Sequence, residues 1–180
     1  TLGHGVYAGS IDELILTNSI IRNVNGGGHI LKSRAPRNFL STTSLLGQNG
    51  YQSRTIDLPC GGDLTIDNSI LQHGRNASNM DMIALGTEPR FCKTVRSSSV
   101  SITNSRLFFD RLSQEKEQAP SDNPSFLFNW LAPLKKVDVS ENHIINLKDW
   151  STKWSRKNIQ IPDQSANNRM CATRKDCGID

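Results

Sequence analysis

Three residues that recur at a fixed spacing carry side chains suited to acid–base chemistry. Tyr7, Lys32 and Asp57 stand 25 residues apart, each within a short partly apolar segment. A carboxylate beside a lysine favours the charged ammonium, which leaves the tyrosine hydroxyl as the better proton acceptor. If the three side chains lie together, they form a surface that holds a negative charge and exchanges protons.

Two histidines and an arginine flank this triplet. His4 and His29 share the 25-residue spacing, and Arg34 follows Lys32 by two positions. A guanidinium can bind a carboxylate through two parallel hydrogen bonds. β-Elimination on a uronate needs a cation on the carboxylate, a base for the C5 proton and an acid for the leaving oxygen. We therefore expect Lys32 and Arg34 to neutralise a uronate, and Tyr7 or His29 to exchange the protons.

Paired carboxylates give an alternative interpretation. A glycoside hydrolase needs two carboxyl groups across a groove, and Asp57 with Asp81 are the candidates, Asp63 being a weaker one. In the lyase interpretation His4, Asp57 and Asp81 bind the substrate. A third interpretation is a non-catalytic carbohydrate-binding or adhesive protein. In the plainest interpretation Lys32 and Asp57 form only a surface ion pair worth ~0–1 kcal/mol.

Internal repeats indicate which elements position these residues. Similar segments contain a polar corner between apolar flanks, and a weaker fifth copy follows with a one-residue ambiguity in its alignment. The corners, taken as Asn18, Thr43, Asn68 and Asn104, are 25, 25 and 36 residues apart. The copies are LILTNSII (14–21), FLSTTSLL (39–46), LTIDNSIL (64–71), VSITNSRL (100–107) and VDVSENHI (137–144).

A second series of short segments precedes each copy, at 5–9, 30–34, 55–59, 82–86 and 126–130. Each period thus holds at least two short strands with no room for a helix, which is typical of a stacked repeat. We predict an all-β chain, a right-handed parallel β-helix (solenoid) of about five coils. A β-sandwich is the competing fold, but it does not require a fixed period.

Stacking in such a fold places equivalent residues on neighbouring coils ~4.8 Å apart. Alternation within the strand then sends Val6, Leu31 and Ile56 to the core. Tyr7, Lys32 and Asp57 point outward as one column, and the corner asparagines are expected to form a hydrogen-bonded ladder along the stack.

Insertions and a tail interrupt the repeat. We expect loops leaving the coil body around 73–98 and 111–125, both rich in charged and turn residues. Residues 1–145 are assigned to the β-helix and 146–180 to a C-terminal tail or cap. Because the repeat begins without a capping segment, we expect a longer β-helix or another chain covering the first coil, with association through that coil.

Composition narrows the function classes. The chain of 180 residues is 36% hydrophobic and 21% charged with a net charge of +4, which fits a globular domain. Basic residues are scattered without interleaved aromatics, so nucleic acid is not favoured, and no apolar run is long enough to span a membrane. We expect no cofactor; calcium stays open without an Asp-rich motif to support it.

Four cysteines bear on the cellular compartment. None forms a Cys-x-x-Cys pair, so zinc is poorly supported. The even count permits Cys60–Cys92 and Cys171–Cys177 disulfides, with four free thiols as the alternative. Two disulfides favour an oxidising compartment, and we predict a secreted or periplasmic protein.

The motifs resemble a family of bacterial right-handed β-helix proteins in the pectate-lyase-like superfamily. The resemblance covers roughly residues 1–145 and is carried by the Asn-Ser corners and by GHGVYAG (3–9), GHILKSRA (28–35) and IDLPCGGDL (56–64). Members include lyases, hydrolases and epimerases acting on polysaccharides, and proteins with no known activity. The resemblance implies that the chain continues N-terminally in relatives. Together with the cations Lys32 and Arg34, it leads us to expect an acidic polysaccharide as partner.

The same resemblance marks the motif positions His4, Tyr7, His29, Lys32, Arg34 and Asp57. The Asp-Pro-His-Asp motif of the alginate epimerases is missing from this sequence, which argues against that activity.

Overall fold

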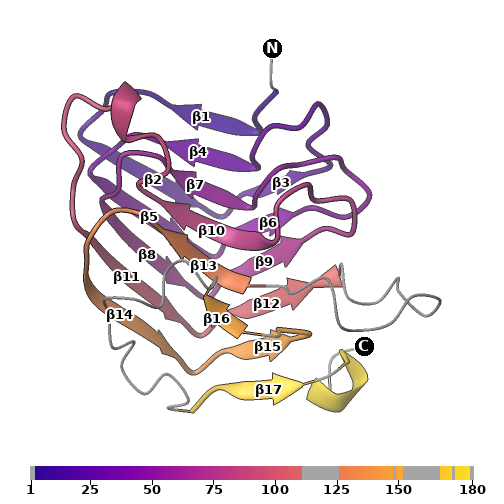
Figure 1. Cartoon of the computed structure of the whole chain (residues 1–180). Helices are drawn as coiled ribbons and strands as arrows, with labels where there is room; N and C mark the ends of the chain where they lie inside the picture. The colour runs from indigo at the N-terminus through magenta and orange to yellow at the C-terminus, as the bar shows by residue number, and fades with distance from the viewer. Residues whose placement is uncertain (1–2, 111–125, 148, 152–166, 172, 179–180) are drawn as a thin grey trace.

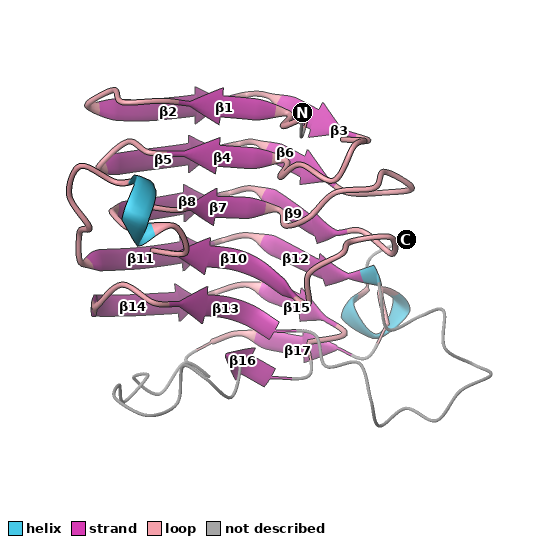
Figure 2. Ribbon diagram, turned by 45° about the horizontal axis from the view of Figure 1, so that its top comes forward, coloured by secondary structure: helices cyan, strands magenta, loops and turns pink. Residues whose placement is uncertain are grey.

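The described chain consists of three parallel β-sheets, here called A, B and C (Figure 1). The computed structural model describes residues 3–110, 126–147, 149–151, 167–171 and 173–178. The strands of each sheet are stacked in chain order from the N-terminal end to the C-terminal end (Figure 2).

The strands are short, and their bounds are as follows. Sheet A contains β1 (Val6–Ala8), β4 (Leu31–Ser33), β7 (Ile56–Leu58), β10 (Asp81–Leu85), β13 (Phe126–Trp130) and β16 (Asp149–Ser151). Sheet B contains β2 (Glu13–Thr17), β5 (Arg37–Ser41), β8 (Asp63–Asp67), β11 (Ser98–Thr103) and β14 (Leu134–Ser140). Sheet C contains β3 (Ile20–Arg22), β6 (Ser44–Leu46), β9 (Ile70–His73), β12 (Arg106–Phe109), β15 (His143–Ile145) and β17 (Arg169–Cys171).

The order of the strands gives the repeat a structural unit. The chain passes through sheets A, B and C in turn, five times, from β1–β2–β3 to β13–β14–β15. We call each such passage a rung. Every strand pair among the described residues is parallel, which confirms the all-β prediction and excludes the antiparallel sandwich. Beyond the fifth rung, β16 extends sheet A and β17 extends sheet C.

The core lies between the three sheets and consists of columns of aliphatic residues, one from each rung. In sheet B, Leu16, Leu40, Ile66 and Ile102 are successive register partners, and the last three are fully buried. In sheet A the predicted core residues Leu31 and Ile56 are register partners, Ile83 continues their column, and all three are fully buried. Burying a side chain of this size stabilises the fold by ~1.5–3 kcal/mol. Because each column continues from rung to rung, the rungs share one core.

A left-handed backbone conformation turns each sheet B strand into sheet C. The corner residues Asn18, Thr42, Asn68 and Asn104 have φ between 48° and 51°, and Glu141 at the fifth corner has φ 59°. The sequence alignment that equated Thr43 with Asn18 is therefore wrong by one residue. Leu16 pairs with Leu40 and Leu40 with Ile66, so the first two steps are 24 and 26 residues rather than 25 and 25. Asparagine tolerates this conformation, whereas threonine rarely adopts it, which is why composition alone misplaced the second corner.

The residue after each corner carries the hydrogen-bonded ladder. The backbone N–H of Thr43 donates to Ser69 Oγ at 3.1 Å, that of Ser69 to Ser105 Oγ at 3.0 Å, and that of Ser105 to Asn142 Oδ1 at 2.8 Å. All four side chains are buried. The predicted asparagine ladder is therefore displaced by one position. The Asn68 side chain does reach the neighbouring rung, donating to Thr42 Oγ1 at 3.4 Å, but it does not satisfy backbone.

One expected insertion folds back onto the body instead of leaving it. Within 73–98 the structure places β10, and the extra residues are 86–97, between β10 and β11. This segment, which we call the strap, contains the 3₁₀ helix η1 (Pro89–Phe91) and lies where β7 and β10 end (Figure 2). The other expected loop, 111–125, lies outside the described residues.

Both permitted disulfides are formed. Cys60–Cys92 ties the strap to the connection between β7 and β8, and Cys171–Cys177 closes β17 against the 3₁₀ helix η4 (Lys175–Cys177). No helix within the described residues is both long and apolar enough to span a bilayer.

The ladder yields a stability prediction. Ser105→Ala removes the acceptor of the Ser69 backbone N–H, leaving a buried donor without a partner. We expect a loss of about 1–3 kcal/mol in the free energy of unfolding, measured by urea denaturation. Ser101→Ala, on the outer face of β11, the strand that leads into this corner, is the matched control, because Ser101 makes no side-chain hydrogen bond among the described residues. Equal losses in the two variants would show that the ladder contributes nothing specific.

Candidate functional site

The predicted column of Tyr7, Lys32 and Asp57 exists on the outer face of sheet A. The three residues are direct register partners on β1, β4 and β7. Only Tyr7 is open to solvent, with 56% of its surface exposed, against 7% for Lys32 and 1% for Asp57. The column is thus in register as predicted, but two of its three members are buried.

The strap is the reason for this burial. Backbone hydrogen bonds from Gly86, Glu88 and Arg96 to the carbonyls of residues 58–60, together with the Cys60–Cys92 disulfide, fasten it beside the end of β7. Gly86 has φ +76°, and a Cβ at this position would lie 2.5 Å from that of Ala132, so only glycine fits where the strap begins.

Glu88 brings a carboxylate from the strap into contact with both cations of the column. Its Oε1 accepts from Lys32 Nζ, and its Oε2 from the Arg34 guanidinium at 2.7 Å. Burial opposes ionisation of Glu88, but the hydrogen bonds and charges of Lys32 and Arg34 outweigh it, and the pKa of Glu88 is lowered. Arg34 and Lys32 therefore hold the two oxygens of one carboxylate, that of Glu88.

Asp57 is the second carboxylate of the cluster. Thr87 of the strap donates to its Oδ1 at 2.8 Å, and Lys32 Nζ and His29 Nε2 lie 3.5 and 3.3 Å from its Oδ2. Burial raises the pKa of Asp57, although Thr87 and Lys32 act in the opposite direction. Two cations and two carboxylates thus balance one another beneath the strap.

The histidines lie on the side of the column away from the strap contacts. The His4 and His29 rings stack with centroids 5.3 Å apart, and His4 Nδ1 accepts from the His29 backbone N–H. Burial and the nearby Arg54 and Lys32 charges lower the pKa of His29 to about 3, so His29 is neutral at pH 7. Tyr7 stacks on His4 and its hydroxyl accepts from Arg34 Nε at 3.1 Å.

The carboxylates of the hydrolase interpretation have other surroundings. Asp81 lies on β10, is buried, and is paired with Arg54, which also donates to Asn79 at 3.0 Å. Asp57 and Asp81 are therefore both enclosed by protein rather than set across an open groove. Asp63 lies on β8 of sheet B, where it accepts from the Ser99 backbone N–H, and takes no part in the cluster.

Glu88 and Thr87 are site residues that were not predicted from the sequence. Each lies in a connection of irregular structure, to which periodicity assigns no position. A signal did exist: a Cys60–Cys92 bond would hold the segment just before Cys92 close to the strand that carries Asp57.

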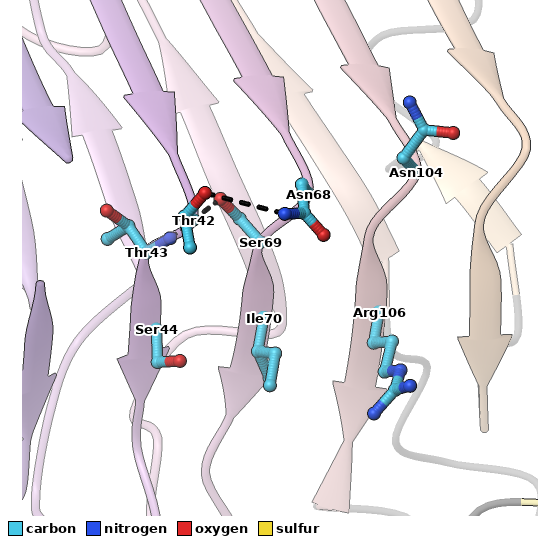
Figure 3. Close-up of a pocket in the computed structure, with 8 residues that line it drawn as sticks. All are labelled: Thr42, Thr43, Ser44, Asn68, Ser69, Ile70, Asn104 and Arg106. Atoms are coloured by element: carbon cyan, nitrogen blue, oxygen red, sulfur yellow. Dashed lines mark hydrogen bonds between the residues drawn. The ribbon is translucent and has the colours of Figure 1, made fainter. Parts of the chain in front are cut away.

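Two surface hollows lie near the sheet corners. One, of about 320 Å³, is lined by small polar groups and by Arg106 at the corner between sheets B and C; Asn68 and Thr42 meet there (Figure 3). The other, of about 470 Å³, adjoins the strap and is lined by Arg37, Arg96 and Lys135. Arg96 also donates to the Arg34 carbonyl at 3.5 Å, which joins the second hollow to the cluster.

Within the described residues, no group of three or more His, Cys, Asp and Glu side chains is arranged to hold a metal ion. No protein-family model, curated protein or solved structure matches the chain.

The neutral state of His29 predicts a pH dependence of stability. The pKa of His29 is about 3 in the folded chain and 6.5 in the unfolded one. Between pH 3 and 6.5 the imidazole of His29 is therefore protonated in the unfolded chain and neutral in the folded one. Stability contributed by neutral His29 is complete above pH 6.5 and is lost as the pH falls towards 3. From pH 6.5 to 4.5, the loss should be about 2 kcal/mol larger in wild type than in His29→Gln, measured by urea unfolding. Identical pH profiles would contradict this assignment.

Proposed function

We propose that the chain is a right-handed parallel β-helix of the pectate-lyase-like superfamily. The repeated passage through sheets A, B and C, with each strand pairing in parallel with its equivalent one rung on, supports this. The right hand follows from the strong preference of crossovers between parallel strands of one sheet.

We further propose that the outer face of sheet A binds an acidic polysaccharide. One observation carries the proposal: Lys32 and Arg34 already bind the two oxygens of one carboxylate, that of Glu88. Lys32 lies on β4, and Arg34 follows the last residue of that strand. The adjoining hollow has three cations in its lining, Arg37, Arg96 and Lys135, against the single carboxylate of Asp63, and would hold further acidic sugars of the same chain.

The proposed reaction is β-elimination. Lys32 and Arg34 neutralise the uronate carboxylate, which makes the C5 proton more acidic. Tyr7, whose hydroxyl oxygen accepts from Arg34, takes the C5 proton on that oxygen as it releases its own hydroxyl proton to the leaving oxygen. The C5–H and C4–O bonds break and a C4=C5 double bond forms. Tyr7 suits this role better than His29, because it is exposed whereas His29 is buried.

A non-catalytic carbohydrate-binding protein is the second candidate. The observation that favours it is the mutual charge compensation of the buried cluster, which leaves Lys32 and Asp57 out of contact with solvent. Such a protein would retain the polysaccharide without shortening it.

The two disulfides support secretion or a periplasmic location, since such bonds persist in oxidising compartments. Association through the first rung stays a prediction. Its strands are the end strands of all three sheets, and Ile15 and Ile20 are exposed there.

The test is incubation with a panel of uronate polymers, namely polygalacturonate, alginate and polyglucuronate, followed by ultraviolet absorbance of the unsaturated product. Tyr7→Phe and Arg34→Ala should each lower kcat/KM by on the order of 100-fold or more. Arg22→Ala, on the exposed face of sheet C, should change little.

The outcomes separate the candidates. Polymer that is bound but keeps its length would indicate the binding function. If none of the uronate polymers is cleaved and none is bound, an acidic polysaccharide is excluded as the ligand.

A further inference from the structure

The carboxylate-binding pair of sheet A is filled by a part of the same chain. Both oxygens of Glu88 are held, one by Lys32 and the other by Arg34. A bidentate contact of this kind is the arrangement that a uronate carboxylate would need. The two carboxylates cannot occupy the pair together.

We propose that the strap is an autoinhibitory segment in which Glu88 is a built-in competitor for the carboxylate of an acidic ligand. Binding of a uronate at Lys32 and Arg34 then requires Glu88 to leave. This inference rests on the proposed acidic-polysaccharide function and adds to it the residue that limits access to the site.

Displacing the strap would expose little apolar surface that is now buried. Its 3₁₀ helix contributes no buried residue, Phe91 is 77% exposed and Val95 is exposed as well. The side chain of Glu88 itself is 29% exposed, so the ion pairs can be reached from solvent. Apart from the Cys60–Cys92 disulfide, the contacts that hold the strap against sheet A are polar: backbone hydrogen bonds, the Thr87–Asp57 hydrogen bond and the Glu88 ion pairs.

The Cys60–Cys92 disulfide keeps the competitor close. Cys92 lies four residues after Glu88. Cys60 lies two residues after the end of β7, the strand that carries Asp57. A ligand tethered so near its site competes at a high effective concentration. The disulfide also places Arg34 against the strap, since its guanidinium Nη1 lies 3.5 Å from Cys60 Sγ and 3.4 Å from the Phe91 carbonyl oxygen.

Charge explains why only an acidic ligand gains from removing Glu88. Without it, Lys32 keeps Asp57 at 3.5 Å as a partner. Arg34 keeps no carboxylate partner among the described residues, only the Tyr7 hydroxyl, the Phe91 carbonyl and the sulfur atoms of Cys60 and Cys92. The site then carries one uncompensated positive charge, which a carboxylate neutralises and a neutral sugar does not.

The experiment compares binding by calorimetry in wild type, Glu88→Gln and the control Glu141→Gln, an exposed glutamate at the corner of the fifth rung. The probes are oligogalacturonate, oligoguluronate and oligoglucuronate, each beside its carboxyl-reduced, neutral form. Glu88→Gln should bind at least one acidic oligomer about 10-fold more tightly than wild type, as expected when a competent state populated near a tenth becomes dominant. Neutral oligomers and Glu141→Gln should show no gain.

A second variant covers the case in which Glu88→Gln fails to fold. Cys60→Ser with Cys92→Ser releases the tether and should raise affinity for the same acidic oligomer, with folding checked by circular dichroism. If the strap variants bind an acidic oligomer no more tightly than wild type does, the autoinhibition is overturned while the polysaccharide function stands. No binding by any variant overturns both.

Discussion

Parallel hydrogen bonding between successive rungs is the constraint on which the rest of the structure depends. It fixes which residue lies above which, and a shift of one residue would turn every core side chain outward. At the corner between sheets B and C, where the strands stop pairing, the buried hydroxyls of Ser69 and Ser105 and the amide of Asn142 accept the otherwise unpaired backbone N–H groups. The register is therefore maintained through the turn as well as along the strands.

That register creates the charged cluster from residues distant in sequence. Tyr7, Lys32 and Asp57 meet because β1, β4 and β7 pair without offset. Three adjacent strands alone would leave two cations, Lys32 and Arg34, against a single carboxylate. The strap supplies the missing negative charge through Glu88, so the balance of the cluster depends on a segment outside the repeat.

The sequence was most informative where it repeats. The outward column and its inward neighbours Leu31 and Ile56 were predictable, because strand alternation and spacing determine them. The even number of cysteines only permitted the two disulfides and left four free thiols as the alternative. The second corner was misplaced because positions 42 and 43 are both threonine. Only the backbone conformation of Thr42 and the hydrogen bond from the Thr43 backbone N–H to the next rung distinguish them. The position of the strap, and with it Glu88, depends on contacts with residues 58–60 that no local pattern encodes.

The composition of the buried cluster bears on whether the strap is only a cover. Burying charges costs solvation that even good ion pairs barely recover, and an apolar plug of the same volume is often as stable or more so. A strap selected for stability alone would therefore be expected to place aliphatic side chains over β4 and β7. Here it places Thr87 and Glu88 there and leaves Phe91 in solvent. The apolar side chain faces water and the charged one faces the protein, an arrangement suited to a segment that gives way to a charged ligand.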